Sequence, residues 1–163
     1  MKKILVAYFS CSGVTEHAAK ILAAAAGADL FEIKPEIPYT SADLNWTDST
    51  SRSSLEMADP SCRPAVAEKI SDMAQYDTVF LGFPIWWYVA PSIINTFLES
   101  YDFSGKTIIP FATSGGSGFG KTEKLLKALC PADTKWLPGR MLNGRITEQN
   151  ISDWVKSLGL QLI

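Results

Sequence analysis

The chain has 163 residues, of which 47% are apolar, and this is enough for one domain, spanning residues 1–163, with one hydrophobic core. Its formal net charge is -2 and only 20% of its residues are charged, so the charge balance does not favour nucleic acid or an anionic membrane surface as a partner. Its three cysteines, Cys11, Cys62 and Cys130, form no CxxC pair, which argues against a disulfide framework or a zinc site. We therefore expect a cytoplasmic protein that binds neither nucleic acid nor membranes.

Apolar runs alternate with helical patterns along the chain. Residues 4–9 form a continuous apolar run, which is typical of a parallel strand that is covered on both faces. Further strands are expected at residues 30–33, 78–83, 107–112 and, interrupted by Pro138 and Gly139, 135–142. Helices are expected at residues 14–26, 64–73, 91–98, 119–129 and 151–158. This alternation predicts an α/β protein with three α/β/α layers and a five-stranded parallel sheet.

One segment breaks the alternation. Residues 36–63 are polar and have no clear period, although Tyr39, Trp46 and Arg52 lie among them. Loops of this length within one domain are usually functional or disordered. In a parallel sheet, ligands bind beyond the carboxyl ends of the strands. The segments that follow the first, third and fourth strands are therefore the places to look for a binding site.

Residues 10–15, which follow the first strand, combine hydroxyl groups with a glycine at the start of a helix. A phosphate at this position would meet unpaired backbone N–H groups and the positive end of the helix dipole. Each residue has an expected part: Ser10, Ser12 and Thr15 add hydroxyl donors, Gly13 permits a close backbone approach, and Cys11 and Val14 contribute main-chain groups. The alternative interpretation is an ordinary Ser/Thr helix cap.

The S-x-S-G-x-T pattern of residues 10–15 resembles the phosphate loop of flavodoxins, T/S-x-T/S-G-x-T. The resemblance extends over nearly the whole chain in length, element order and loop position. It implies the strand order 2-1-3-4-5, one bound FMN and single-electron carriage, in the short-chain form of the family. The stretch 43–46, with Ser51, Arg52 and Glu56 after it, also resembles part of a flavodoxin-like subgroup, and no catalytic role is assigned to it.

Three adjacent aromatic residues follow the third strand. Side chains of this kind at the carboxyl end of a strand would stack on a flat apolar ligand such as the isoalloxazine ring of FMN. The resemblance implies the following ring contacts, with Trp86 or Trp87 as the stacking side chain: Pro84, Ile85, Trp86, Trp87 and Tyr88. The alternative is that these aromatic residues belong to the core or to a dimer interface.

A glycine-rich loop follows the fourth strand, and its exposed amides would bind the polar edge of the flavin. The expected contacts are Thr113, Ser114, Gly115, Gly116 and Gly118. Many flavodoxins place a tyrosine on the outer ring face from this loop, whereas the only aromatic residue here is Phe119. The outer face is therefore expected to be open, or to be covered by Tyr39 or Trp46. An open face would admit a hydride donor or a small acceptor.

Residues 115–122 also match the nucleotide-binding pattern G-x-x-x-x-G-K-S/T between a strand and a helix. Such a loop needs a magnesium-binding acid from another strand. Few residues follow Thr122, and the first and third strands end without an acid. An ATP- or GTP-binding function therefore stays a minor alternative.

The sequence favours an FMN-binding electron carrier that meets redox partner proteins transiently over the dimethylbenzene edge of the flavin. The alternative is an FMN-dependent reductase that passes hydride from NAD(P)H to a quinone or another small acceptor. A third possibility is a flavin-free binding or assembly module that retains the fold.

Overall fold

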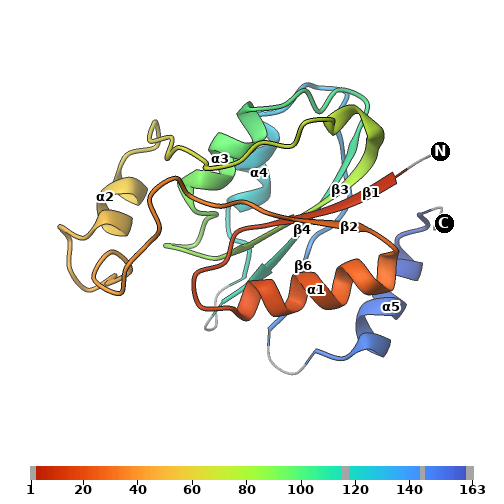
Figure 1. Ribbon diagram of the computed structural model, residues 1–163, viewed down its shortest axis with the longest axis horizontal. Coiled ribbons are helices and arrows are strands. Elements are labelled where there is room, and N and C mark those ends of the chain that lie inside the picture. The colour runs from red at the N-terminus through yellow and green to blue at the C-terminus, as the bar shows by residue number, and fades with distance from the viewer. Residues whose placement is uncertain (1–2, 115–117, 144–145, 161–163) are drawn as a thin grey trace.

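In a computed structural model, which describes residues 3–114, 118–143 and 146–160, the predicted alternation of strands and helices is present (Figure 1). The strands are β1 Lys3–Tyr8, β2 Asp29–Glu32, β3 Tyr76–Pro84, β4 Thr107–Thr113, β5 Lys135–Trp136 and β6 Arg140–Met141. The helices are α1 Val14–Ala26, α2 Arg52–Ala58, the short 3-10 helix η1 Met73–Gln75, α3 Ser92–Glu99, α4 Thr122–Lys127 and α5 Glu148–Ser157. In the described part of the chain, no helix is both long and apolar enough to cross a membrane.

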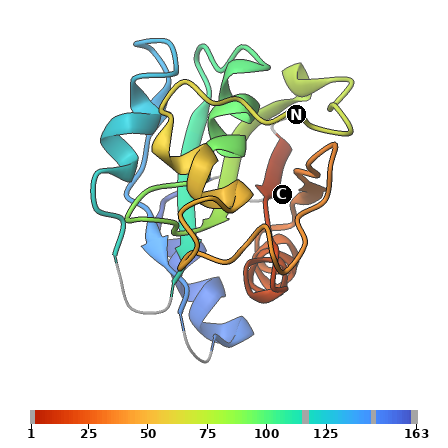
Figure 2. The ribbon, with the colours of Figure 1, turned by 90° about the vertical axis from the view of Figure 1, so that its left-hand side faces the viewer.

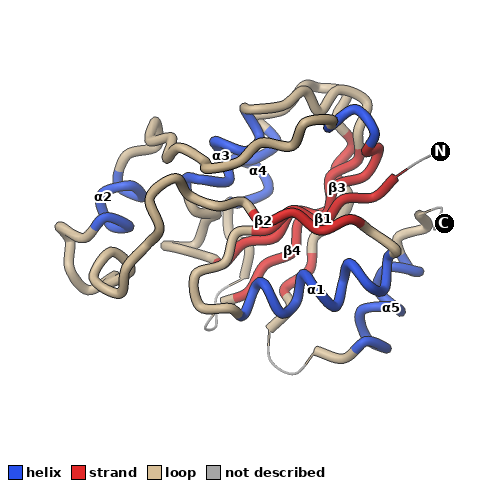
Figure 3. The backbone as a smooth tube through the Cα atoms, in the orientation of Figure 1, coloured by secondary structure: helices blue, strands red, loops and turns tan. Residues whose placement is uncertain are grey.

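The sheet is parallel and has the order β2-β1-β3-β4-β5, with β6 also paired to β4. Helices α1 and α5 cover one face and α3 and α4 the other (Figures 1 and 3), which confirms the predicted three layers. Each face has its own buried cluster, because successive strand residues point to opposite sides. Leu5 and Val79 pack on the side of α3, whereas Val6 and Phe80 pack on the side of α1 and α5.

The fifth strand position is divided between β5 and β6. Ile108 of β4 pairs with Trp136, and Phe111 pairs with Arg140, so three residues, 137–139, lie opposite the two residues Ile109 and Pro110. Proline has no N–H to donate to a neighbouring strand, which interrupts the ladder at this point. The backbone N–H of Gly139 instead donates to the Glu123 carboxylate of α4 at 3.2 Å.

The helix predicted over residues 64–73 is wrong. Residues 65–67 are extended and lie beside residues 34–36, with the N–H of Glu36 donating to the carbonyl of Ala65 and that of Ala67 to the carbonyl of Lys34. Only Met73 to Gln75 form a short 3-10 helix. So short a segment forms only a marginal helix on its own, and here residues 34–36 pair with the carbonyl of Ala65 and the N–H of Ala67.

The polar segment 36–63 contains a helix that the sequence analysis missed. The Ser51 side chain caps α2 by accepting a hydrogen bond from the backbone N–H of Ser54. This segment extends beyond the carboxyl edge of the sheet, and α2 lies in front when the molecule is viewed from that side (Figure 2). It therefore stands beside the loops in which the ligand site is expected.

The backbone of β3 approaches β4 closely at Gly82. A Cβ at this position would lie 2.1 Å from the ring of Phe111, which is fully buried and cannot move away. We expect Gly82→Ala to lower the free energy of unfolding by about 1–3 kcal/mol through overpacking. Urea denaturation of the flavin-free protein measures this. Gly118→Ala is the control, since a Cβ there meets nothing within 4 Å. Equal stabilities of the two variants would contradict the packing.

Candidate functional site

The loop between β1 and α1 leaves the first turn of the helix without a side-chain cap. Gly13 is the N-cap residue and has φ of 89°, a conformation that glycine adopts without strain. Its N–H donates to Ser10 Oγ at 3.2 Å, so Ser10 folds the loop and does not cap the helix. Residues 11–14 are exposed. The first backbone N–H groups of α1 are therefore open to an anion, and this geometry disfavours the alternative of an ordinary Ser/Thr cap.

Three loops meet at this edge of the sheet through Thr113. The hydroxyl of Thr15, which is 2% exposed, lies 2.8 Å from the hydroxyl of Thr113 at the end of β4. The backbone carbonyl of Thr113 accepts a hydrogen bond from the N–H of Ile85 at 2.9 Å. The structure thus brings Thr15, Ile85 and Thr113 together, and the hydroxyls of Thr15 and Thr113 share one hydrogen bond in which either can be the donor.

The aromatic residues after β3 form a tight turn. Trp86 and Val89 exchange two backbone hydrogen bonds, at 2.8 and 3.1 Å, around Trp87 and Tyr88. Both central residues have positive φ, 49° and 67°. Bulky residues rarely adopt this conformation, and such strain is concentrated at functional sites. Trp87 is 43% exposed and Tyr88 is 71% exposed, whereas Pro84, Ile85 and Trp86 are partly buried.

Trp86 points into an aromatic cluster with Phe9 and Tyr39. The three rings contact one another edge-on, with centroids 5.6 to 5.7 Å apart. This geometry is favourable for aromatic pairs. Trp86 is therefore a support of the turn, and Trp87 is the tryptophan whose ring is available to a ligand.

A network of charges and hydrogen bonds holds Tyr39 in place. Its hydroxyl donates to the Glu56 carboxylate at 2.5 Å, and the Arg52 guanidinium lies over its ring at 3.8 Å from the centroid. Arg52 also binds Glu56 at 3.1 Å and the carbonyl of Ile37 at 2.7 Å. Burial, followed by the hydrogen bond to Glu56, raises the pKa of Tyr39 well above its ordinary value. The Tyr39 side chain is therefore uncharged and held in one position.

Cys11 lies close to this network. Its residue is exposed, yet desolvation of the thiol raises its pKa to about 11, and the nearby Arg52 opposes this only in part. The thiol is consequently neutral at physiological pH, and it adds no negative charge beside a phosphate.

The glycine-rich loop after β4 is described only in part. Ser114 donates its backbone N–H to the Asn143 side chain at 2.7 Å, and Gly118 is exposed. Gly115 and Gly116 lie outside the described residues. Thr122, which would bind magnesium in a nucleotide loop, is fully buried and donates its hydroxyl to the carbonyl of Phe119. This bonding disfavours the nucleotide-binding alternative.

The sequence analysis did not assign Phe9, Arg52 or Glu56 to the site, and it considered Tyr39 only as a cover of the outer ring face. Ser51 followed by Arg52 and Glu56, which are four residues apart, is a signature of a capped helix with an ion pair between successive turns. That signature could have predicted α2. The packing of Tyr39 on Phe9 and Trp86 joins distant parts of the chain, and it carries no local signal.

Comparisons with known proteins bear on the family and the fold of the chain. A family model described as Flavodoxin matches residues 3–158. No match was found among curated proteins. A crystal structure of a candidate flavoprotein from Bacteroides eggerthii is 50% identical, covers 99% of this chain and 100% of its own, and superposes with a TM-score of 0.92. A similar candidate from Bacteroides uniformis is also 50% identical, covers 95% and 98%, and has a TM-score of 0.90.

A more distant structure shares the fold. A flavoprotein from Lactobacillus acidophilus in complex with FMN is 18% identical, covers 98% of this chain and 100% of its own, and has a TM-score of 0.72. At this identity the likeness concerns the architecture alone. It agrees with the sheet order observed here.

The raised pKa of Cys11, about 11, can be tested by alkylation. At pH 8 we expect iodoacetamide to modify Cys11 of the folded, flavin-free protein about 100-fold more slowly than in the unfolded chain, because only the thiolate reacts. The rate should rise about tenfold per pH unit until about pH 11. Mass spectrometry of the Cys11 peptide measures the rate. A plateau that begins near neutral pH would show that the helix dipole prevails over desolvation.

Proposed function

Because the chain belongs to the flavodoxin family, we propose that it binds FMN non-covalently at the carboxyl edge of its sheet and carries electrons between redox partners. FMN as the cofactor is supported by the family match and by the related flavoprotein that was solved in complex with FMN. The observation that carries the proposal is the exposed first turn of α1, which begins at Gly13 with φ of 89° and no side-chain cap.

The residues present fit the phosphate of FMN. The loop 10–15 contains no Lys or Arg, and Lys20, one turn further on, is paired with Glu16 at 2.9 Å. Backbone N–H groups, the helix dipole and the hydroxyls of Ser10 and Ser12 would therefore hold the phosphate. Arg52, whose charge acts on Cys11, is paired with Glu56. A loop without a cation of its own suits a resident group better than a phosphate that is transferred.

The residues after β3 fit the ring. We assign Trp87 as the stacking side chain, since its ring is exposed while Trp86 packs against Phe9 and Tyr39. Main-chain groups around Thr113 and Gly118 would face the polar edge of the ring. When bound, FMN supplies one- and two-electron chemistry, while the chain fixes its position and its electrostatic surroundings.

Exposed apolar side chains support electron carriage. Val14 is 55% exposed, beside the proposed phosphate, and Trp87 and Tyr88 are exposed at the tip of the turn. A redox partner docking transiently over the flavin would cover such side chains. Nucleic acid and membranes are not among the proposed partners, and a cytoplasmic location stays a prediction.

One observation favours a reductase as the second candidate. The loop after β4 has no tyrosine to cover the outer flavin face. Tyr39 cannot move over it without leaving Glu56 and Arg52, and Trp46 is 74% exposed. An uncovered face would let NAD(P)H approach.

Anaerobic mixing with NADH and NADPH separates the two candidates. For a carrier we expect the purified protein to be yellow and its flavin absorbance to stay unchanged until a partner reductase is added. Rapid bleaching of the flavin by either nucleotide alone would contradict the carrier function and support the reductase function. A protein that takes up no FMN at all would contradict both.

The division of roles between the two tryptophans gives a further prediction. We expect Trp87→Ala to weaken FMN binding by about 1–3 kcal/mol with little change in the free energy of unfolding, because it removes ring stacking alone. Trp86→Ala should instead lower the free energy of unfolding of the flavin-free protein by about 3 kcal/mol. Flavin fluorescence titration and urea denaturation measure the two effects.

Trp46→Ala is the matched control, since Trp46 is exposed but lies in the segment 36–63. It should change neither the affinity for FMN nor the free energy of unfolding. An FMN affinity that falls as much in Trp46→Ala as in Trp87→Ala would contradict the assignment of Trp87.

A further inference from the structure

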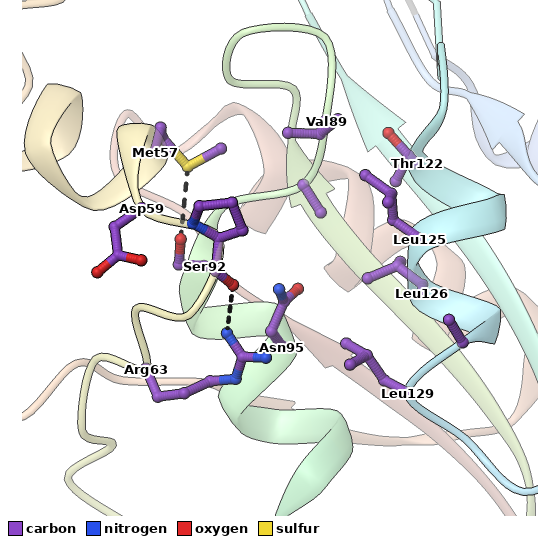
Figure 4. Close-up of a pocket in the computed structure, with 13 residues that line it drawn as sticks. Met57, Asp59, Arg63, Val89, Ser92, Asn95, Thr122, Leu125, Leu126 and Leu129 are labelled. Carbon is purple, nitrogen blue, oxygen red and sulfur yellow. Dashed lines mark hydrogen bonds between the residues drawn. The ribbon is translucent and has the colours of Figure 1, made fainter.

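A cavity lies behind the aromatic turn, on the side of the sheet that α3 and α4 cover (Figure 4). Its volume is about 420 Å³, which is within the usual range for small-molecule sites. Its walls come from the end of α2 and the chain after it, from the segment before α3, from α3 and from α4. Most of the lining is aliphatic, including Met57, Val89, Leu125, Leu126 and Leu129. None of the residues assigned to FMN lines it.

One polar side chain enters this cavity without a partner. The carboxamide of Asn95, on α3, points into the space between the two walls in Figure 4. Among the described residues, no hydrogen bond to this side chain occurs, whereas the neighbouring Ser92 hydroxyl lies 3.7 Å from the Met57 sulfur. A carboxamide offers both donors and an acceptor. It would therefore bind a carbonyl or amide group of a ligand whose body is apolar.

The charged residues at the rim are already satisfied. The guanidinium of Arg63 pairs with Glu99 and donates to the carbonyls of Pro60 and Cys62. The carboxylate of Asp59 accepts hydrogen bonds from the backbone and the side chain of Ser61 at 2.9 and 2.7 Å. An anionic or cationic ligand would find no free counter-charge here and would lose its hydration on entering. The lining thus selects a neutral ligand.

We propose that this cavity is a binding site for a neutral, largely apolar small molecule with one carbonyl-type group, which hydrogen-bonds to Asn95 while its apolar body packs between Met57 and the leucines of α4. The site is distinct from the FMN site. Val89 belongs to its wall and also closes the aromatic turn by its backbone bonds to Trp86, so the ligand would lie directly behind that turn.

The test uses coumarin, a neutral bicyclic lactone, with coumarin-3-carboxylate as its charged analogue. Each is titrated into the FMN-treated protein, and two-dimensional NMR follows the amide and methyl signals. We expect coumarin to shift the signals of Val89, Leu126, Leu129 and the Asn95 side-chain NH₂ with saturation. The carboxylate should bind at least about tenfold more weakly because it must be desolvated. Asn95→Leu should weaken coumarin binding about fivefold through loss of one hydrogen bond.

Two tryptophan variants of α4 complete the test. Leu125→Trp fills the cavity from its mouth, where Leu125 is 50% exposed, and it should abolish the shifts. Lys124→Trp, on the same helix but outside the cavity, should leave them intact. The proposal is overturned if coumarin shifts no cavity signal at the limit of its solubility, if Leu125→Trp binds as well as Lys124→Trp, or if the carboxylate binds as tightly. FMN retention is measured separately by fluorescence, so a failure here is distinguishable from a failure of FMN binding.

Discussion

The site depends on one backbone conformation, the positive φ of Gly13 at the start of α1. This conformation turns the chain from β1 into the helix within a few residues and leaves the helix without a side-chain cap. The first N–H groups of α1 therefore keep their hydrogen-bonding capacity, and the helix dipole adds positive potential at the same point. The buried contact between Thr15 and Thr113 fixes the position of this turn relative to the end of β4. A phosphate would meet a site that is formed in advance by the fold.

The proposed ring site is also formed in advance, because its shape is set by contacts within the protein. Trp87 and Tyr88 adopt left-handed conformations at the tip of a turn, and such strain persists only where the surroundings enforce it. Trp86 supplies that support by packing on Phe9 and Tyr39. Tyr39 in turn is held by Arg52 and Glu56. The polar segment 36–63 thus acts as a scaffold for the aromatic turn.

The parts of the fold that follow from local patterns could be predicted from the sequence. The apolar run of β1, the helical pattern of α1 and the alternation of strands and helices all lie within short windows. Pro138 and Gly139 likewise marked the interruption between β5 and β6. By contrast, residues 64–73 have the composition of a helix but become extended, because residues 34–36 take up their hydrogen bonds. That competition comes from a distant segment and cannot be read from residues 64–73 alone.

The candidate site shows the same limit. The phosphate loop is one continuous stretch, so its pattern could be recognised directly. The choice between Trp86 and Trp87 could not be made from sequence, since it depends on which ring Phe9 and Tyr39 bury. The contact between the hydroxyls of Thr15 and Thr113 could not be predicted either, because the two residues are 98 positions apart in the sequence. Residues that act through long-range packing need the structure.

The most direct test of the account compares the affinities of FMN and riboflavin, which differ only in the phosphate. If the first turn of α1 binds that phosphate through several charge-assisted hydrogen bonds, FMN should bind about 100-fold or more tightly than riboflavin. The affinities are measured by quenching of flavin fluorescence in the same buffer. Equal affinities for the two flavins would contradict the central claim, because the ring alone would then account for binding.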